Sequence, residues 1–145
     1  MLADTGHGQT PETIRQWEER IRLAREQGMR AVVAATMERW FTAAFRGSPR
    51  AQEIAALIAA TPVEGYAGCA QAIMRLATTA RLPEIGVPVL AIAGESDAAA
   101  AGTRYIGEHI PGARLVILPQ AAHIANVEQP EAFNRALEEF LRSAV

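Results

Sequence analysis

The sequence predicts a protein of the α/β class, in which a helical region precedes two parallel strands that alternate with helices. Three observations support this prediction. Residues 1–81 carry apolar side chains at helical spacing, residues 87–94 form a continuous apolar run, and the last expected helix is strongly amphipathic. The chain has 145 residues, half of them apolar, which is enough to bury a core.

Residues 1–81 are expected to form a compact layer of four short helices, because no repeat is visible in them. Their limits follow from residue types typical of helix ends, such as a threonine cap, a first-turn proline or a glycine stop. Thr-Pro-Val-Glu at 61–64 has the form of a capping box. The expected helices cover residues 10–28, 29–45 and 48–58, and the fourth begins at 61–64.

Residues 82–145 are expected to contain a strand, a helix, a second strand and a last helix. The run VPVLAIAG suits a parallel strand buried on both faces, and residues 114–118 form a second apolar strand. The intervening helix covers residues 98–110, and the last helix begins near Pro130. Its apolar face consists of Phe133, Ala136, Leu137, Phe140 and Leu141.

Two such strands do not make a complete sheet. Strands that are apolar on both faces would leave unpaired amides and apolar side chains in contact with water at the edges and faces of the pair. We therefore expect further strands to come from elsewhere.

Composition excludes several classes of function. Fourteen basic and 16 acidic residues are well mixed and give a net charge of −2, so neither nucleic acid nor an anionic membrane surface is an expected partner. The single cysteine allows no intramolecular disulfide, and neither a secretory signal nor a membrane-length apolar run is visible, so a cytoplasmic location is expected. No spacing resembles a metal site or a phosphate-binding loop, so no metal or cofactor is expected.

Two residues stand where α/β folds place their chemistry, at the carboxyl ends of parallel strands. Asp97 follows the first strand and His123 follows the second, 26 positions later. In a nucleophilic triad, a carboxylate orients an imidazole that takes the proton of the attacking hydroxyl. Taken singly, Asp97 is also typical of a helix cap, and His123 of a solvated loop histidine.

Other candidates carry weaker patterns. Ser96 lies in GESDA, which is close to a nucleophile turn but lacks its final glycine. Cys69 falls inside an expected helix and is interpreted as a packed thiol. His7 and His109 have no partners in the sequence that suggest a role.

The motifs PVLAIAGESD and AAHIANVEQPEAFNRALEEFL resemble the C-terminal part of α/β-hydrolases, and the resemblance extends from Pro88 to Leu141. The segments MRAVVAATMERWFTAAF and EGYAGCAQAIMRLA resemble the cap of 3-oxoadipate enol-lactonases, which are β-ketoadipate enol-lactone hydrolases. The resemblance implies a partial α/β-hydrolase fold, with a helical cap in residues 1–81 and the last two strand-helix units in 82–145.

The resemblance also implies roles for individual residues. Asp97 and His123 match the acid and the histidine of the family's triad, whose order is serine, acid, histidine. Trp40 matches a cap residue that lines the substrate pocket, although core packing explains an aromatic residue at this spacing equally well. The serine motif GxSxG has no match in this sequence, so the nucleophile is expected from an N-terminal hydrolase segment.

Three hypotheses follow. In the first, the chain supplies the acid and the histidine of a hydrolase that cleaves a small lactone or ester. In the second, it is a non-catalytic hydrolase remnant that completes its sheet by forming a homo-oligomer and binds a small ligand. In the third, Asp97 and His123 act alone as an acid–base pair.

Overall fold

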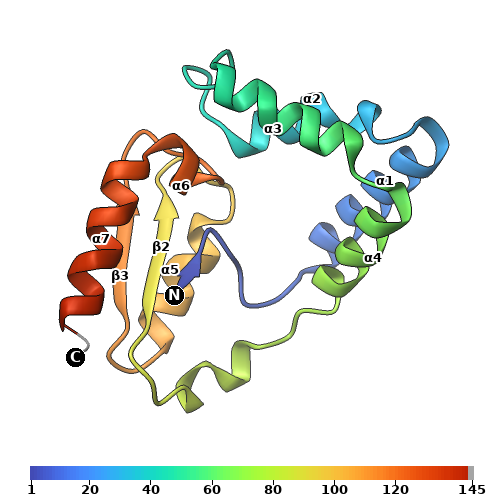
Figure 1. Ribbon diagram of the computed structural model, residues 1–145. Coiled ribbons are helices and arrows are strands. Elements are labelled where there is room, and N and C mark those ends of the chain that lie inside the picture. The colour runs from blue at the N-terminus through green and yellow to red at the C-terminus, as the bar shows by residue number, and fades with distance from the viewer. Residues whose placement is uncertain (144–145) are drawn as a thin grey trace. The chain divides into compact units, whose positions relative to one another are not determined.

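A computed structural model describes residues 1–143 (Figure 1). The chain forms two compact units, and each is continuous in space but not in sequence. The first unit consists of residues 1–7, 39–42 and 78 onward, and the second consists of residues 8–38 and 43–77.

The first unit contains a three-stranded parallel sheet. Its strands are β1 (Leu2–Ala3), β2 (Leu90–Gly94) and β3 (Arg114–Leu118), and β2 lies in the centre. Leu2 of β1 pairs with Ala91, and the five residues of β2 pair in register with the five of β3. Every residue of β2 is buried, as its continuous apolar sequence predicts.

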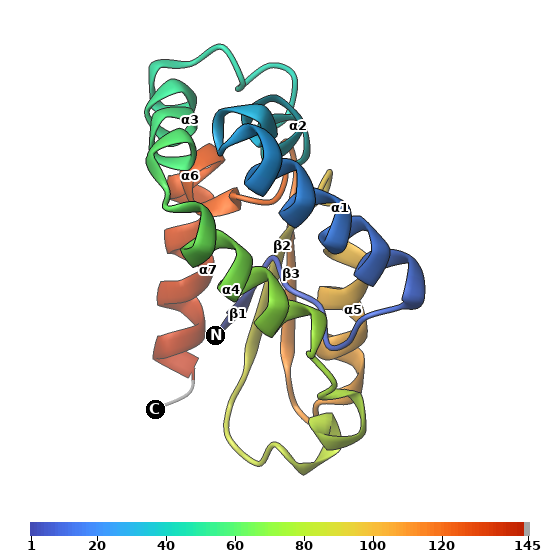
Figure 2. The ribbon, with the colours of Figure 1, turned by 90° about the vertical axis from the view of Figure 1, so that its right-hand side faces the viewer.

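Two helices cover opposite faces of this sheet, α5 (Ala100–His109) and α7 (Pro130–Ser143), as Figure 2 shows with the strands seen between them. On the α7 side, Leu90 and Ile92 pack with Phe133 and Ala136. On the α5 side, Val89 and Ala91 pack with Leu82, Ile106 and Ile110. The alternation of residues along β2 between two apolar clusters explains why both faces of this strand must be covered.

Strand β1 corrects one expectation. Residues 1–81 were expected to be helical and the further strands to come from elsewhere, but Leu2–Ala3 supplies one further strand from within the chain. A strand of two residues is too short to show alternation, and its pairing with Ala91 depends on contacts far away in sequence. The remaining short elements of this unit, which the sequence analysis did not predict, are a 3₁₀ helix η1 (Thr79–Glu84) and α6 (Ala125–Glu128).

The second unit is helical. Helix α1 (Pro11–Gln27) packs on α4 (Val63–Met74) through Ile21, Ala67 and Ala70. The unit also contains α3 (Pro49–Ala60) and the first nine residues of α2 (Arg30–Trp40), whose last two residues belong to the first unit. Helix α2 ends five residues earlier than expected, and a turn follows it.

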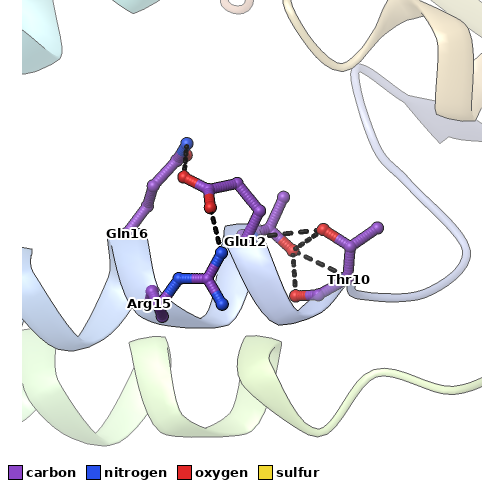
Figure 3. A network of polar contacts seen from close by, with 5 residues as sticks. Thr10, Glu12, Arg15 and Gln16 are labelled. Carbon is purple, nitrogen blue, oxygen red and sulfur yellow. Dashed lines mark hydrogen bonds and ion pairs between the residues drawn. The ribbon is translucent and has the colours of Figure 1, made fainter.

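Two helix starts show how caps decide the boundaries. Thr10 caps α1, because its hydroxyl accepts from Thr13 N and Thr10 N donates to the Thr13 hydroxyl (Figure 3). The capping box expected at 61–64 is wrong. Pro62 is the cap of α4, the Thr61 hydroxyl donates to Leu57 O at 2.9 Å, and Glu64 pairs instead with Arg25 of α1.

Two features are absent from residues 1–143. None of their helices has the length and apolar character needed to cross a membrane. Within the same residues, no three His, Cys, Asp or Glu side chains come together as a group that could bind a metal ion.

Candidate functional site

The candidate site lies at the carboxyl edge of the parallel sheet. Asp97 belongs to the turn after β2, and His123 belongs to the loop between β3 and α6. Because β2 and β3 are parallel and paired in register, the two loops leave the sheet side by side.

The two predicted side chains are in contact. His123 Nδ1 lies 3.1 Å from Asp97 Oδ1, within hydrogen-bond distance. A carboxylate accepts, so this bond holds the proton on Nδ1 and leaves Nε2 as the basic nitrogen of the neutral ring. No described residue forms a hydrogen bond with Nε2, and a third of the His123 side chain is exposed.

Asp97 is not the cap of the next helix. Ala99 is the N-terminal cap of α5 and makes no side-chain cap bond, whereas Asp97 Oδ1 accepts from Ala99 N at 3.0 Å. The Asp97 side chain is 1 % exposed, and its second oxygen, Oδ2, has no hydrogen-bond partner among the described residues. An unpaired buried oxygen is costly, and polar atoms left in this state are often found at functional sites.

The electrostatics of this pair favour a charged imidazole. The hydrogen bond to Asp97 raises the pKa of His123, and the negative charges of Asp97 and Asp4 act in the same direction. Burial and the positive charge of Arg39 oppose these effects, but the net shift of the pKa is upward. The pKa of His123 is therefore raised from the ordinary value of a histidine side chain.

Backbone contacts fix the two loops to each other. Glu95 N donates to Leu118 O at 2.8 Å, and Ser96 N donates to Ala121 O at 2.9 Å. Gly94 lies so close to the second loop that an added Cβ would stand 2.2 Å from Ala122 O. Only glycine allows this approach. The sequence GESD therefore supplies both Gly94, which sets the separation of the two loops, and Asp97, the acid of the site.

Glu128 is a buried acid that the sequence analysis did not identify. It is 7 % exposed and accepts from Ala122 N at 2.7 Å and from Thr42 N at 2.9 Å. The Thr42 hydroxyl donates to the same carboxylate. Glu128 therefore fixes the start of the His123 loop, and only its place after that histidine in HIANVEQP could have suggested a role.

Asp4 is the second buried acid that the sequence analysis did not identify. It follows β1 and is 9 % exposed, and its Oδ1 accepts from Gly94 N at 2.8 Å. Burial raises the pKa of Asp4 to about 6, with a further contribution from the charge of Asp97, while the hydrogen bond from Gly94 and the charge of His123 lower it.

Trp40 lies beside the imidazole. The ring centroids of Trp40 and His123 are 6.1 Å apart, and the backbone joins the same segments, because Ile124 N donates to Trp40 O at 3.2 Å. The structure thus brings together all three residues singled out from the sequence, while their roles remain predictions.

The weaker candidates lie apart from this arrangement. Ser96 is exposed in the turn that carries Asp97, and no hydrogen bond between described residues joins it to His123. His7 and His109 stack on the two sides of Tyr105, with centroid distances of 4.1 and 3.6 Å.

The interpretation of Cys69 as a packed thiol is wrong. Its side chain is exposed. Helix α4 packs through Ala67, Ala70 and Met74, and position 69 lies off this face.

Comparison with known proteins relates this site to a family. Solved structures of a hydrolase from Pseudomonas aeruginosa PA01 and of the enol-lactonase from Burkholderia xenovorans LB400 superpose with TM-scores of 0.87 and 0.84. Each is 36% identical and covers 97% of this chain, which covers 54% of each. The chain therefore has part of the α/β-hydrolase fold.

Sequence comparison gives the same result. The chain is 38% identical over 130 residues to 3-oxoadipate enol-lactonase 2 of Acinetobacter baylyi, a match that covers 87% of this chain and 48% of that protein. It is 30% identical over 131 residues to 3-oxoadipate enol-lactonase 1 of the same organism. No protein-family model matches the chain.

The similarity covers only part of these relatives. The chain spans about half the length of the curated relatives it matches. It has the partial fold expected from the resemblance, with helices followed by the last strand-helix units of a parallel sheet.

Proposed function

We propose that this chain supplies the acid and the histidine of a serine-type lactone or ester hydrolase. The observation that carries the proposal is the 3.1 Å contact between His123 Nδ1 and the buried Asp97 carboxylate, at the edge of the sheet where α/β folds bind substrates. The names of the similar enol-lactonases support the same chemistry.

The serine comes from an N-terminal hydrolase segment outside this sequence. Its hydroxyl attacks the acyl carbon of the substrate while His123 Nε2 takes the proton, and Asp97 stabilises the resulting imidazolium. The acyl C–O bond then breaks, and His123 returns the proton to the leaving oxygen. In the second half of the reaction, water attacks the acyl-serine and gives its proton to His123, which returns it to the serine oxygen.

The same proposal assigns a substrate and a role to Trp40. An enol-lactone is the expected substrate class, by analogy with the proteins named 3-oxoadipate enol-lactonase. The indole of Trp40, with its centroid 6.1 Å from that of the imidazole, forms an apolar wall beside the reacting group. The cytoplasm is the expected location of the protein.

The open edges of the sheet favour an additional polypeptide. Strand β1 pairs through only two residues, and no described strand pairs with the outer edge of β3. Because unpaired strand edges readily accept another strand, the N-terminal hydrolase segment is the expected partner. A second copy of the chain would serve the same edges in the alternative hypothesis of a non-catalytic, self-associating protein.

Reconstitution tests the proposal. The 145-residue chain is mixed with the N-terminal half of an enol-lactonase, and hydrolysis of an enol-lactone or a nitrophenyl ester is measured. His123→Ala should abolish the restored activity, while the matched variant His109→Ala should keep it, because His109 stacks on Tyr105 away from Asp97. Activity that survives His123→Ala would rule out the assignment.

The alternative is tested by the size of the isolated chain. Light scattering should give a dimer or larger assembly if the chain closes its sheet with a second copy. A monomer that unfolds cooperatively and gains hydrolase activity only in the mixture would exclude self-association as the function.

A further inference from the structure

Asp4 occupies a position that connects the two functional loops. Its Oδ1 accepts from Gly94 N at 2.8 Å, at the end of the strand that leads to Asp97. Gly94 in turn lies against the loop that carries the histidine, since an added Cβ there would stand 2.2 Å from Ala122 O. Asp4 thus fixes the glycine at which the end of β2 meets the loop of His123.

The backbone around Asp4 is itself held in place. Asp4 N donates to Ile92 O at 2.9 Å, and the neighbouring Thr5 exchanges two hydrogen bonds with the buried Thr103 of α5. Asp4 has a φ of 47°, in the left-handed region that non-glycine residues seldom adopt. Backbone conformations of this kind persist where the surrounding structure holds them, and they cluster at functional sites. This is why we consider a function for Asp4.

Two buried carboxylates hold the backbone around His123. Glu128 accepts from Ala122 N, immediately before the histidine, and Asp4 accepts from Gly94 N, at the glycine that packs against Ala122 O. Glu128 lies six residues after Ala122 in the sequence, whereas Asp4 lies 90 residues before Gly94. Hydrogen bonds to charged acceptors are among the stronger ones, so the loop has little freedom to move.

Asp4 and His123 also interact through their charges. The two groups that act electrostatically on Asp4 are Asp97, from the turn after β2, and His123, from the loop after β3. The imidazole in turn responds to Asp97, to Asp4 and to Arg39 at the end of α2. His123 is therefore subject to two negative charges, only one of which bonds to it directly.

We propose that Asp4 is a positioning residue for His123, which fixes the end of β2 against the loop of the histidine and adds a second negative charge to its surroundings. The proposal rests on the proposed function, since it assigns Asp4 a task in the same site. Asp4 acts through the imidazole and its loop, and it needs no contact with substrate.

The test is an NMR titration of the His123 ring in the full 145-residue chain. Asp4→Asn retains an oxygen that can accept from Gly94 N but removes the charge, so it should lower the pKa of His123. Glu95→Gln removes a charge from an exposed side chain at the same strand end and should leave that pKa unchanged. Asp4→Ala removes the hydrogen bond from Gly94 N as well as the charge, and should in addition remove the Nδ1–H signal of His123 that its bond to Asp97 protects.

A second measurement needs no variant. In the unmodified chain, the carboxyl carbon of Asp4 and the ring of His123 should each show an inflection at the other's titration. An unchanged His123 pKa in Asp4→Asn would overturn the proposal, and so would independent titrations in the unmodified chain. If Asp4→Asn lowers the pKa of His123 but the mixed chains hydrolyse no substrate, the proposed function is overturned. The positioning role of Asp4 would then stand.

Discussion

Replacing Gly94 with alanine should separate the two loops of the site and destabilise the unit that contains the sheet. The added Cβ would stand 2.2 Å from Ala122 O and 2.5 Å from Ala121 O, where real contacts of this kind stay above 3.0 Å. Both neighbours are backbone atoms, so no side chain can rotate away. The second loop must therefore move by about 0.8 Å, the difference between 3.0 and 2.2 Å.

The expected cost follows from this displacement. Forcing an additional methyl group into a packed interior costs about 1–3 kcal/mol. Moving Ala121 also weakens the 2.9 Å bond from Ser96 N, and such a bond contributes about 1 kcal/mol. We therefore expect Gly94→Ala to lower the free energy of unfolding by about 3 kcal/mol, which corresponds to a fall of roughly 1.5 M in the urea midpoint for a small domain.

A urea titration followed by the NMR amide signals of β2 measures this loss. Gly86→Ala is the matched control, because an added Cβ at Gly86 meets nothing within 4 Å in the same unit. That control should change the free energy of unfolding by no more than about 0.5 kcal/mol. If the two variants unfold at the same urea concentration, the close approach of Gly94 to the second loop is not real.

Three further predictions concern the buried acids. Asp97→Asn should lower the pKa of His123, measured by NMR titration, because it removes the carboxylate that stabilises the imidazolium. Glu128→Ala should cost about 2–4 kcal/mol in a urea titration by leaving the buried Ala122 N–H unpaired, and recovery of part of that loss in Glu128→Gln would identify the hydrogen bonds as the cause. Because Asp4 has a pKa raised from 3.8 to about 6, its folded form holds its proton more tightly, so its contribution to stability is complete below about pH 4 and is lost as the pH rises through 6. Asp4→Asn should abolish this part of the pH dependence in thermal unfolding, and an unaltered profile would contradict the assigned pKa.

The elements with strong local patterns could be predicted from the sequence. The bounds of β3 are those of the apolar run 114–118, and α7 begins at the expected proline. In contrast, α2 ends at Trp40, because the following residues turn back so that Thr42 can bond to Glu128. That end depends on a partner 86 positions away, which no local pattern reveals.

The candidate site shows the same division. Asp97 and His123 could be selected because each follows an apolar strand, and the parallel register then brings them into contact. Asp4 could not be selected, because its importance arises from burial and from Gly94, 90 residues later. Charged residues are seldom buried without a partner, so a sequence position alone gives no reason to expect an acid in the interior.

The helical residues 8–77 depart from the sheet-bearing unit and return to it at almost the same point. Gly8 forms a bridge with Ala77, and Thr78 N donates to His7 O at 2.9 Å. A segment whose two ends meet can be exchanged for a longer or shorter one without disturbing the strands on either side. Any replacement must nevertheless contain a segment equivalent to residues 39–42, which belong to the unit with the sheet. This segment supplies Thr42, whose backbone N–H donates to Glu128. This requirement would let the helical residues vary in length while the geometry around the imidazole stays constant.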